Sequence, residues 1–194
     1  ELLFIIIHQT YELWFKLILH ELQTVIQYLQ KDDAYHAHHF LKRVVEVMKV
    51  LTKQIHILET MTPFDFLKFR DHLKPASGFQ SIQFREIEFI AGLKDEQYFE
   101  FFANQPHLLQ LLKQRFNEPD LRTSFFDMLR RLKFDIPEQN SVFSAKRVIR
   151  ALRPLYQNPQ NYGYLYFFTE ALVDFDMSLS LWREHHVNVV ERVI

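Results

Sequence analysis

The chain of 194 residues is long enough for one domain with a substantial core, and 48% of its residues are hydrophobic. Its 23 basic and 24 acidic residues give a net charge of −1, which excludes the strongly positive surface typical of nucleic-acid-binding proteins. The absence of cysteine excludes disulfides, iron–sulfur clusters and any cofactor held by a thiolate. A bound metal must therefore use His, carboxylate or Tyr ligands, and a cytoplasmic location is the default expectation.

The hydropathy pattern and the two ends of the chain give further expectations. No uninterrupted apolar run is long enough to span a membrane, and no signal peptide precedes the first helical pattern. We therefore expect neither a membrane nor a nucleic acid as a partner. The chain starts at Glu1 inside an apolar helical pattern and stops at Ile194 without a helix stop signal. We expect natural N- and C-terminal segments to be missing from the sequence.

Apolar residues at three- and four-residue spacing predict helices over almost the whole chain. Two long helices are expected over residues 2–29 and 34–61. Another begins at Thr62-Pro63, because Thr is a good N-cap and Pro is favoured in the first turn. Further helices are predicted over 80–93, in shorter pieces between 95 and 134 broken at Pro106 and Pro119, and over 141–155 and 162–193. The prediction is a single all-α domain, residues 1–194, built as a helical bundle.

The segment from Phe69 to Phe89 holds a candidate anion-binding group. Its sequence is FRDHLKPASGFQSIQFREIEF, with Pro75 and Gly78 marking a turn between two helical patterns. Phe66 and Arg70 lie four residues apart, so a helix would place a guanidinium beside an aromatic ring. Such a guanidinium suits the binding of a small carboxylate. Alternatively, Arg70 makes ordinary surface ion pairs, and Ser77 and Gly78 simply form a turn and a helix cap.

The last helix holds a candidate metal ligand. Residues 172, 175, 179, 182, 186 and 189 follow one apolar face, and they include Trp182 and His186. A buried imidazole needs a polar partner, and a haem iron is one such partner. The alternative is a core histidine bonded to a carbonyl or a carboxylate. The neighbouring His185 is turned about a quarter of a turn away from this face.

The first helix holds a candidate pair for binding a flat substrate. Phe4 and His8 are four residues apart and share a face, so the ring could stack on a substrate while the imidazole hydrogen-bonds to it. Ordinary packing, with His8 bonded to a nearby polar group or to the backbone, is the alternative. The cluster His36, His38 and His39 has the composition of a metal site, but its members point in different directions around a helix. We interpret that cluster as solvent-exposed.

Three segments together resemble the haem-dependent tryptophan 2,3-dioxygenase family. Residues 2–22 are similar to its F-I-x-x-H-Q-x-x-E-L-W helix, and residues 172–194 to its W-R-x-x-H-x-x-x-V-x-R helix. Residues 58–89, which contain FRDHLKPASGFQS, resemble its central motif. The similarity keeps its order and spacing over nearly the whole chain. It implies an all-α fold with a haem pocket between the long helices.

The resemblance also implies specific roles for the matching residues. His186 matches the proximal haem ligand, and His8 the distal histidine that faces the indole N–H. Arg70 matches the residue that pairs with the substrate carboxylate. Other positions matched to the substrate are Phe4, Phe66, Ala76 and Ser77, and those matched to the haem pocket are Ser77, Gly78, Trp182 and Arg183. Tyr11 departs from the family pattern, which has a small residue there.

The implied reaction is the insertion of both atoms of O2 across the indole C2–C3 bond of L-tryptophan. The product is N-formyl-L-kynurenine, formed in the first step of the kynurenine pathway. The resemblance implies one haem b per subunit, Fe(II) in the active form, and a homotetramer. His8 is then the catalytic residue, acting by orienting the substrate. The alternatives are a related haem protein with another indole substrate and a noncatalytic haem-binding protein.

Overall fold

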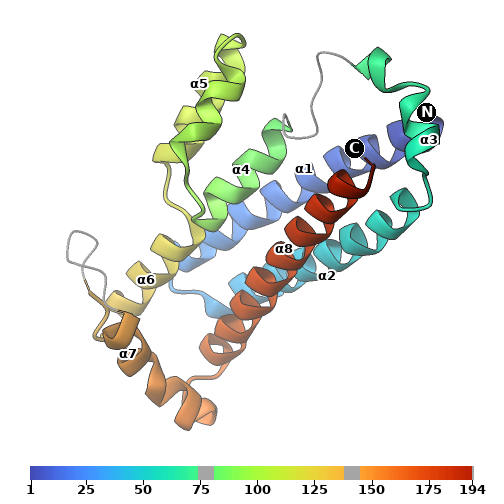
Figure 1. Ribbon diagram of the computed structural model, residues 1–194. Helices are drawn as coiled ribbons and strands as arrows, with labels where there is room; N and C mark the ends of the chain where they lie inside the picture. Colours follow the sequence, from blue (N-terminus) through green and yellow to red (C-terminus); the bar gives the residue numbers. More distant parts are fainter. Residues whose placement is uncertain (74–80, 138–144, 194) are drawn as a thin grey trace.

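Three long helices form the framework of the computed structural model, which describes residues 1–73, 81–137 and 145–193. They are α1 (Leu2–Gln30), α2 (Ala34–Leu58) and α8 (Tyr164–Val193). Helix α2 packs against both α1 and α8, and α1 runs antiparallel to the other two (Figure 1). The described residues contain no β-strand. The predicted all-α fold is therefore confirmed.

Shorter helices surround one side and both ends of this framework. Helices α4 and α6 pack on α1, and α5 packs on α4, from which it projects away from the long helices (Figure 1). Helix α3 lies at the end of the bundle that holds the N-terminus and the C-terminal end of α8. The elements, with η for 3-10 helices, are α3 (Pro63–Leu67), η1 (Arg70–Leu73), α4 (Ile82–Ala91), η2 (Glu96–Phe102), α5 (Pro106–Asn117), α6 (Leu121–Arg131), α7 (Ala145–Gln157) and η3 (Pro159–Asn161).

The main core lies between the long helices, because each presents an apolar face at helical spacing. Leu22 of α1, Leu51 of α2 and Phe168 of α8 are fully buried there. A second, smaller cluster joins α4, η2 and α5 through Phe89, Phe102 and Leu112, which are also fully buried. The α5 arm, defined as η2 and α5, is thus attached to the bundle through α4.

Local sequence signals account for several helix ends. Thr62 caps α3 by accepting a hydrogen bond from the Asp65 amide, as its position before Pro63 predicts. Ser81 caps α4 by accepting from the Phe84 amide, so α4 begins at Ile82 and is shorter than the predicted 80–93. Gly92 ends it with a φ of 99°, a conformation that glycine adopts without strain.

The predicted interruptions at Pro106 and Pro119 are confirmed, because Pro106 lies in the first turn of α5 and Pro119 lies between α5 and α6. Two predicted helix bounds need correction. The predicted helix 141–155 begins at Ala145 and continues to Gln157, past an internal Pro154, while 141–144 lie outside the described residues. Helix α2 ends at Leu58, three residues before the predicted end.

Helix α1 is the one described helix that is long and apolar enough to cross a membrane, with a mean hydropathy of 1.4 over its most apolar window. Core helices of water-soluble proteins and N-terminal signal sequences pass the same test, so this is weak evidence for a membrane. One face of α1 packs against α2, α4 and α6.

Candidate functional site

Two histidines from opposite ends of the sequence lie beside one cavity. His8 is near the start of α1 and His186 is near the end of α8, and the antiparallel packing brings these helix ends together (Figure 1). The cavity has a volume of about 50 Å³. Its lining residues come from α1, α4 and α8 and the residue that caps α4: His8, Tyr11, Glu12, Phe15, Ser81, Phe84, Arg85, Trp182 and His186.

His8 is held as a neutral imidazole with one nitrogen left to accept a hydrogen bond. Its Nδ1 donates to the carbonyl oxygen of Phe4 at 2.8 Å, which assigns the proton to Nδ1 and leaves Nε2 unprotonated. Burial lowers the pKa of His8, although the bond to Phe4 and the charge of Glu12 act in the opposite direction. The Phe4 ring also packs on the imidazole, with 3.9 Å between ring centroids.

His186 lies against the indole of Trp182, one turn earlier on α8. The two rings are stacked, with centroids 5.1 Å apart and planes within 8° of parallel. Burial lowers the pKa of His186, and the charges of His8 and Arg85 lower it further. A neutral imidazole is a common metal ligand in proteins. His185 instead lies near His56 of α2, with ring centroids 5.6 Å apart, and does not line the cavity.

Aromatic rings make up most of the remaining wall. Trp182 packs on Phe84 with ring centroids 4.5 Å apart, and its edge contacts with Tyr11 and Phe15 have centroids 5.9 and 5.7 Å apart. The Tyr11 hydroxyl is directed to the Leu51 carbonyl of α2 at 3.4 Å, and burial raises its pKa. These rings form a closely packed aromatic wall, within which the polar side chains are conspicuous.

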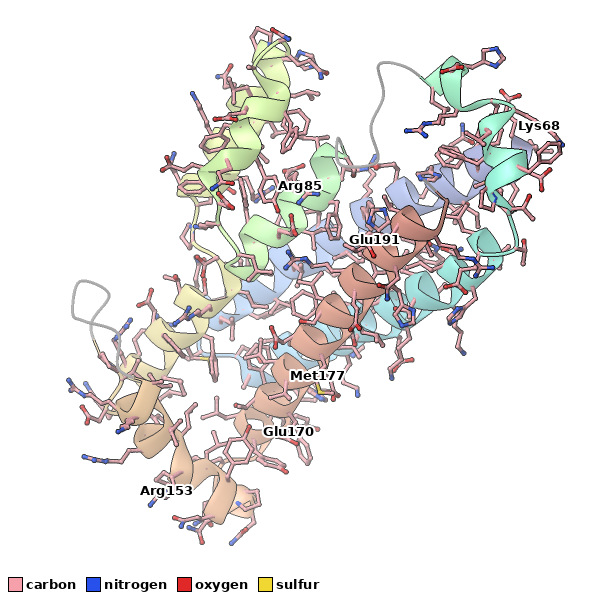
Figure 2. The ribbon with its side chains drawn as sticks, viewed as in Figure 1. Lys68, Arg85, Arg153, Glu170, Met177 and Glu191 are labelled. Atoms are coloured by element: carbon pink, nitrogen blue, oxygen red, sulfur yellow. The ribbon has the colours of Figure 1, made fainter. Side chains whose placement is uncertain are left out.

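A buried charge cluster occupies the α4 side of the cavity. Arg85 lines the cavity and donates from Nη1 to Oε2 of Glu88, one turn along α4 (Figure 2 labels Arg85). Oε1 of Glu88 lies 3.3 Å from Nε of Arg183 on α8. Burial raises the pKa of Glu88, while the charges of Arg85 and Arg183 oppose that rise. The three side chains join α4 to α8 close to His186.

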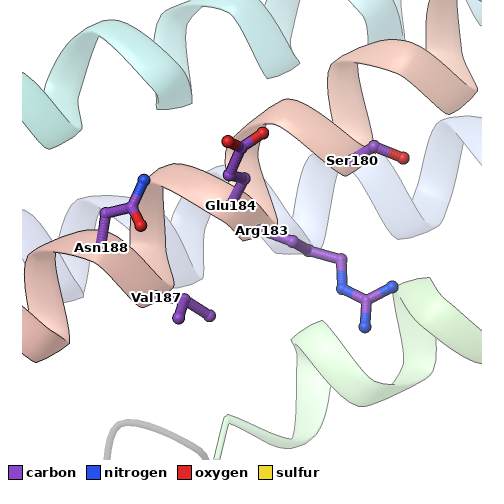
Figure 3. Close-up of a pocket in the computed structure, with 5 residues that line it drawn as sticks. All are labelled: Ser180, Arg183, Glu184, Val187 and Asn188. Atoms are coloured by element: carbon purple, nitrogen blue, oxygen red, sulfur yellow. The ribbon is translucent and has the colours of Figure 1, made fainter.

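A groove on the outside of α8 lies next to this cluster. It has a volume of about 360 Å³ and is lined by Ser180, Arg183, Glu184, Val187 and Asn188 (Figure 3). All five residues belong to one helix face, and Arg183 extends from it towards α4. The groove is an open surface depression, whereas the cavity lined by the two histidines is less open to solvent.

The remaining predicted substrate residues lie around the cavity or beyond it. Phe66 packs on Phe4 with ring centroids 5.8 Å apart, so both rings lie behind His8 and neither lines the cavity. Arg70 begins η1, is exposed, and is not part of the described lining. The predictions for Ala76, Ser77 and Gly78 fall outside the described residues.

Two members of the predicted histidine cluster, His36 and His39, take ordinary structural positions on α2. Nδ1 of His36 lies 2.6 Å from the Asp33 carboxylate at the start of α2, and its ring stacks on Tyr28. His39 lies 3.3 Å from Arg43 on the same helix. Within the described part of the chain, no group of three His, Asp or Glu side chains is arranged to hold a metal ion.

Comparison with known proteins identifies the family. The sequence model described as Tryptophan 2,3-dioxygenase matches residues 1–131. The tryptophan 2,3-dioxygenase of Xanthomonas euvesicatoria is 41% identical over all of this chain and 67% of its own length. Those of Caulobacter vibrioides and a Nocardioides species are 40% and 43% identical, again over the whole chain, which covers 76% and 72% of their lengths.

This chain is a member of the tryptophan 2,3-dioxygenase family. Enzymes of the family depend on haem, so the donor groups of the cavity can be compared with what haem needs. A neutral His186 on an aromatic wall provides one nitrogen ligand for a haem iron. Among the lining residues, Glu12 is the one carboxylate that could compete with it, and none is a cysteine. The chemistry of the lining residues therefore fits a haem. Ligand pockets usually span about 300–1,000 Å³, so a volume of about 50 Å³ must widen to hold a macrocycle.

Sequence reasoning did not find the part that α4 contributes. Arg85 and Glu88 lie among apolar residues in QFREIEF, where charged side chains predict a solvated helix face. Tyr11 and Phe15 could have been found, because they continue the face of α1 that carries His8 at three- and four-residue steps. Nothing in the sequence pattern alone signals that Arg183 reaches Glu88.

Proposed function

We propose that this chain is a haem-dependent dioxygenase that converts L-tryptophan and O2 to N-formyl-L-kynurenine. The observation that carries the proposal is the convergence of His8 and His186, both with pKa values lowered by burial, on one aromatic cavity. Membership of the tryptophan 2,3-dioxygenase family supports the same activity. We further propose one haem b per subunit, Fe(II) in the active form, a homotetramer and a cytoplasmic location.

The two histidines have different proposed roles because their surroundings differ. His186 is the proposed iron ligand, and the stacked Trp182 limits rotation of its ring. His8 is the proposed partner of the substrate indole N–H. Its Nδ1 proton is engaged by the Phe4 carbonyl, so Nε2 accepts. A bound haem would supply the chemistry that adds both oxygen atoms of O2 across the indole C2–C3 bond.

Orientation of the substrate is the main task left to the protein. An acceptor at Nε2 of His8 fixes the edge of the indole, and the surrounding rings exclude water from its face. Arg70 is the proposed partner of the substrate carboxylate, through a charge-assisted hydrogen bond. Arg70 is exposed at the start of η1, so this role requires the carboxylate to lie towards the α3 end of the bundle. Ala76, Ser77 and Gly78 remain proposed substrate and haem contacts.

Absorbance spectra and product analysis test this proposal directly. The purified protein reconstituted with haem should show a haem spectrum that changes on addition of L-tryptophan, and it should form N-formyl-L-kynurenine in air after reduction. His186→Ala should lose haem, whereas His185→Ala should keep it, because His185 faces α2. Haem binding without product from L-tryptophan would instead favour a related protein with another indole substrate. Unchanged haem binding in His186→Ala would refute the assignment of the ligand.

Arg70→Leu separates substrate binding from haem binding. We expect haem content to stay the same and tryptophan affinity to fall by about tenfold or more, as expected for loss of a hydrogen bond to a charged group. Lys68→Leu is the matched control, because Lys68 carries the same charge directly after α3 and pairs with Asp65. Equal tryptophan affinity in both variants would remove Arg70 from the proposed site.

A further inference from the structure

The charge cluster on α4 has a geometry that local helix stability does not explain. Glu88 is 1% exposed, yet its carboxylate serves two arginines from two helices. Arg85 is its neighbour on α4, whereas Arg183 comes from α8, far away in the sequence. Replacing a buried ion pair by apolar residues is often neutral or even stabilising. Stability alone is therefore a weak reason for a carboxylate at this position.

Arg85, the inner arginine of the cluster, lines the cavity and has one buried donor without a partner. The Arg85 side chain is 7% exposed, its guanidinium stacks over the Tyr98 ring at 4.1 Å, and Nη1 is taken by Glu88. Its Nε is buried and has no hydrogen-bond partner among the described residues. A buried donor without a partner is costly, so this atom suits an acceptor group supplied by a ligand.

Arg183, the outer arginine of the cluster, connects the Glu88 carboxylate to α8, the helix that carries the proposed iron ligand His186. Arg183 follows Trp182 directly and precedes His186 by three residues, so all three lie within about one turn of α8. Figure 3 shows Arg183 reaching from α8 towards α4. The contact of Nε with Glu88 therefore fixes the spacing of α4 and α8 beside the cavity.

We propose that Glu88 is a positioning residue of the site: its carboxylate holds the Arg85 guanidinium in the cavity wall and, through Arg183, holds the turn of α8 that carries His186. This inference rests on the proposed function. Glu88 is not among the residues that line the cavity. With the carboxylate between them, the two guanidinium groups leave one net positive charge at this wall, which suits an anionic or strongly accepting ligand group.

Glu86 provides a matched control on the same helix. It is 6% exposed, its carboxylate pairs with Nε of Arg115 on α5 at 3.2 Å, and burial raises its pKa as it does that of Glu88. Glu86 does not line the cavity. The two glutamates therefore share burial, helix and type of partner, and they differ in whether the partner faces the site.

The experiment compares Glu88→Gln with Glu86→Gln. Apoprotein is titrated with haem to obtain its dissociation constant, and urea unfolding of each apoprotein reports its stability. Both variants should be less stable than the parent protein. Glu88→Gln should weaken haem binding by about tenfold or more, as expected for the loss of a charged hydrogen bond, and Glu86→Gln by less than about threefold. Equal haem affinities in two variants of similar stability would overturn the inference.

A double-mutant cycle tests whether Glu88 acts through Arg85. In an Arg85→Met background, the further change Glu88→Gln should raise the haem dissociation constant by a smaller factor than it does in the parent protein, because only the contact with Arg183 remains to be lost. Independent, multiplying effects would show that Glu88 does not act through Arg85, and would overturn the inference. If Glu88→Gln fails to fold, Arg183→Met removes the outer arm at a half-exposed side chain, and Arg183→Lys restores the charge. Haem affinity should fall in Arg183→Met and recover in part in Arg183→Lys. The same haem affinity in both variants would refute the role of the contact between Arg183 and Glu88.

Failure of this inference is distinguishable from failure of the proposed function. A parent protein that binds no haem and forms no N-formyl-L-kynurenine contradicts the proposed function itself. A parent protein that does both, alongside indistinguishable Glu88→Gln and Glu86→Gln variants, contradicts the positioning role alone.

Discussion

Trp182 is the side chain at which core packing and the proposed cofactor site meet. It is 3% exposed and contacts four aromatic side chains, including the stacked imidazole of His186. Replacing a buried tryptophan by alanine typically costs about 3–5 kcal/mol, because contacts are lost and a cavity remains. Folded domains have a free energy of unfolding of about 5–15 kcal/mol. Trp182→Ala is therefore expected to be strongly destabilised and still measurable by unfolding.

Urea unfolding of the apoprotein, followed by circular dichroism, measures this loss. With a denaturant slope of about 2 kcal/mol per M, the expected cost lowers the midpoint by about 1.5–2.5 M. Phe168→Ala is the control, because Phe168 is a fully buried ring on the same helix that contacts Phe125 and does not line the cavity. Both variants should lose similar stability, while Trp182→Ala alone should weaken haem binding, because His186 loses the ring that orients it.

Two results would refute this reasoning about Trp182. A midpoint lowered by less than about 0.5 M, equivalent to about 1 kcal/mol, would mean that the packed wall contributes little to the fold. Equal haem affinities in Trp182→Ala and Phe168→Ala would mean that the stacked indole does not position His186.

Three further predictions follow from the pKa shifts and the helix ends. Burial lowers the pKa of His8, so the unfolded chain takes up a proton as the pH falls below about 6.5 while the folded site stays neutral. The free energy of unfolding should therefore fall from pH 7.5 to 5.5, and it should fall less steeply in His8→Gln. Equal slopes in the two proteins would contradict the lowered pKa. Tryptophan affinity of the haem-loaded protein should drop as the pH falls through the lowered pKa of His8, since protonation removes the Nε2 acceptor; pH-independent affinity would argue against that hydrogen bond. Gly92→Ala should lower the free energy of unfolding by about 1 kcal/mol, because the φ of 99° strains any residue with a Cβ. The added Cβ would lie 3.5 Å from the Cβ of Arg122, which is an ordinary contact. An unchanged midpoint in thermal or urea unfolding would contradict the backbone strain.

Sequence periodicity was sufficient to predict the framework of the fold. The long apolar patterns correspond to α1, α2 and α8 to within a few residues, because these helices bury one continuous face each. Thr62 and Pro63 correctly predicted the start of α3, because both reduce the number of unpaired amide groups at a helix start. The Thr62 side chain accepts from the Asp65 amide, and proline has no amide N–H.

The candidate site was only partly predictable for a physical reason. His8 and His186 could be found because each lies on an apolar helix face, where a polar side chain is conspicuous. Arg85 and Glu88 lie on a helix that is covered from two sides, by α1 and by α5. Burial of its charged side chains results from tertiary packing, and a one-dimensional pattern contains no measure of that packing.

The attachment of the α5 arm through a single short helix has a consequence for hydrogen exchange. The small cluster around Phe102 is separate from the main core, so η2 and α5 can open without exposing the interior of the long helices. Their amide protons should exchange well before those of α1 and α8. Ligand bound between His8 and His186 should slow exchange in α1 and α8 far more than in α5. Helix α4, which contributes Phe89 to one cluster and Arg85 to the cavity, then marks the boundary between two cooperative units of one small domain.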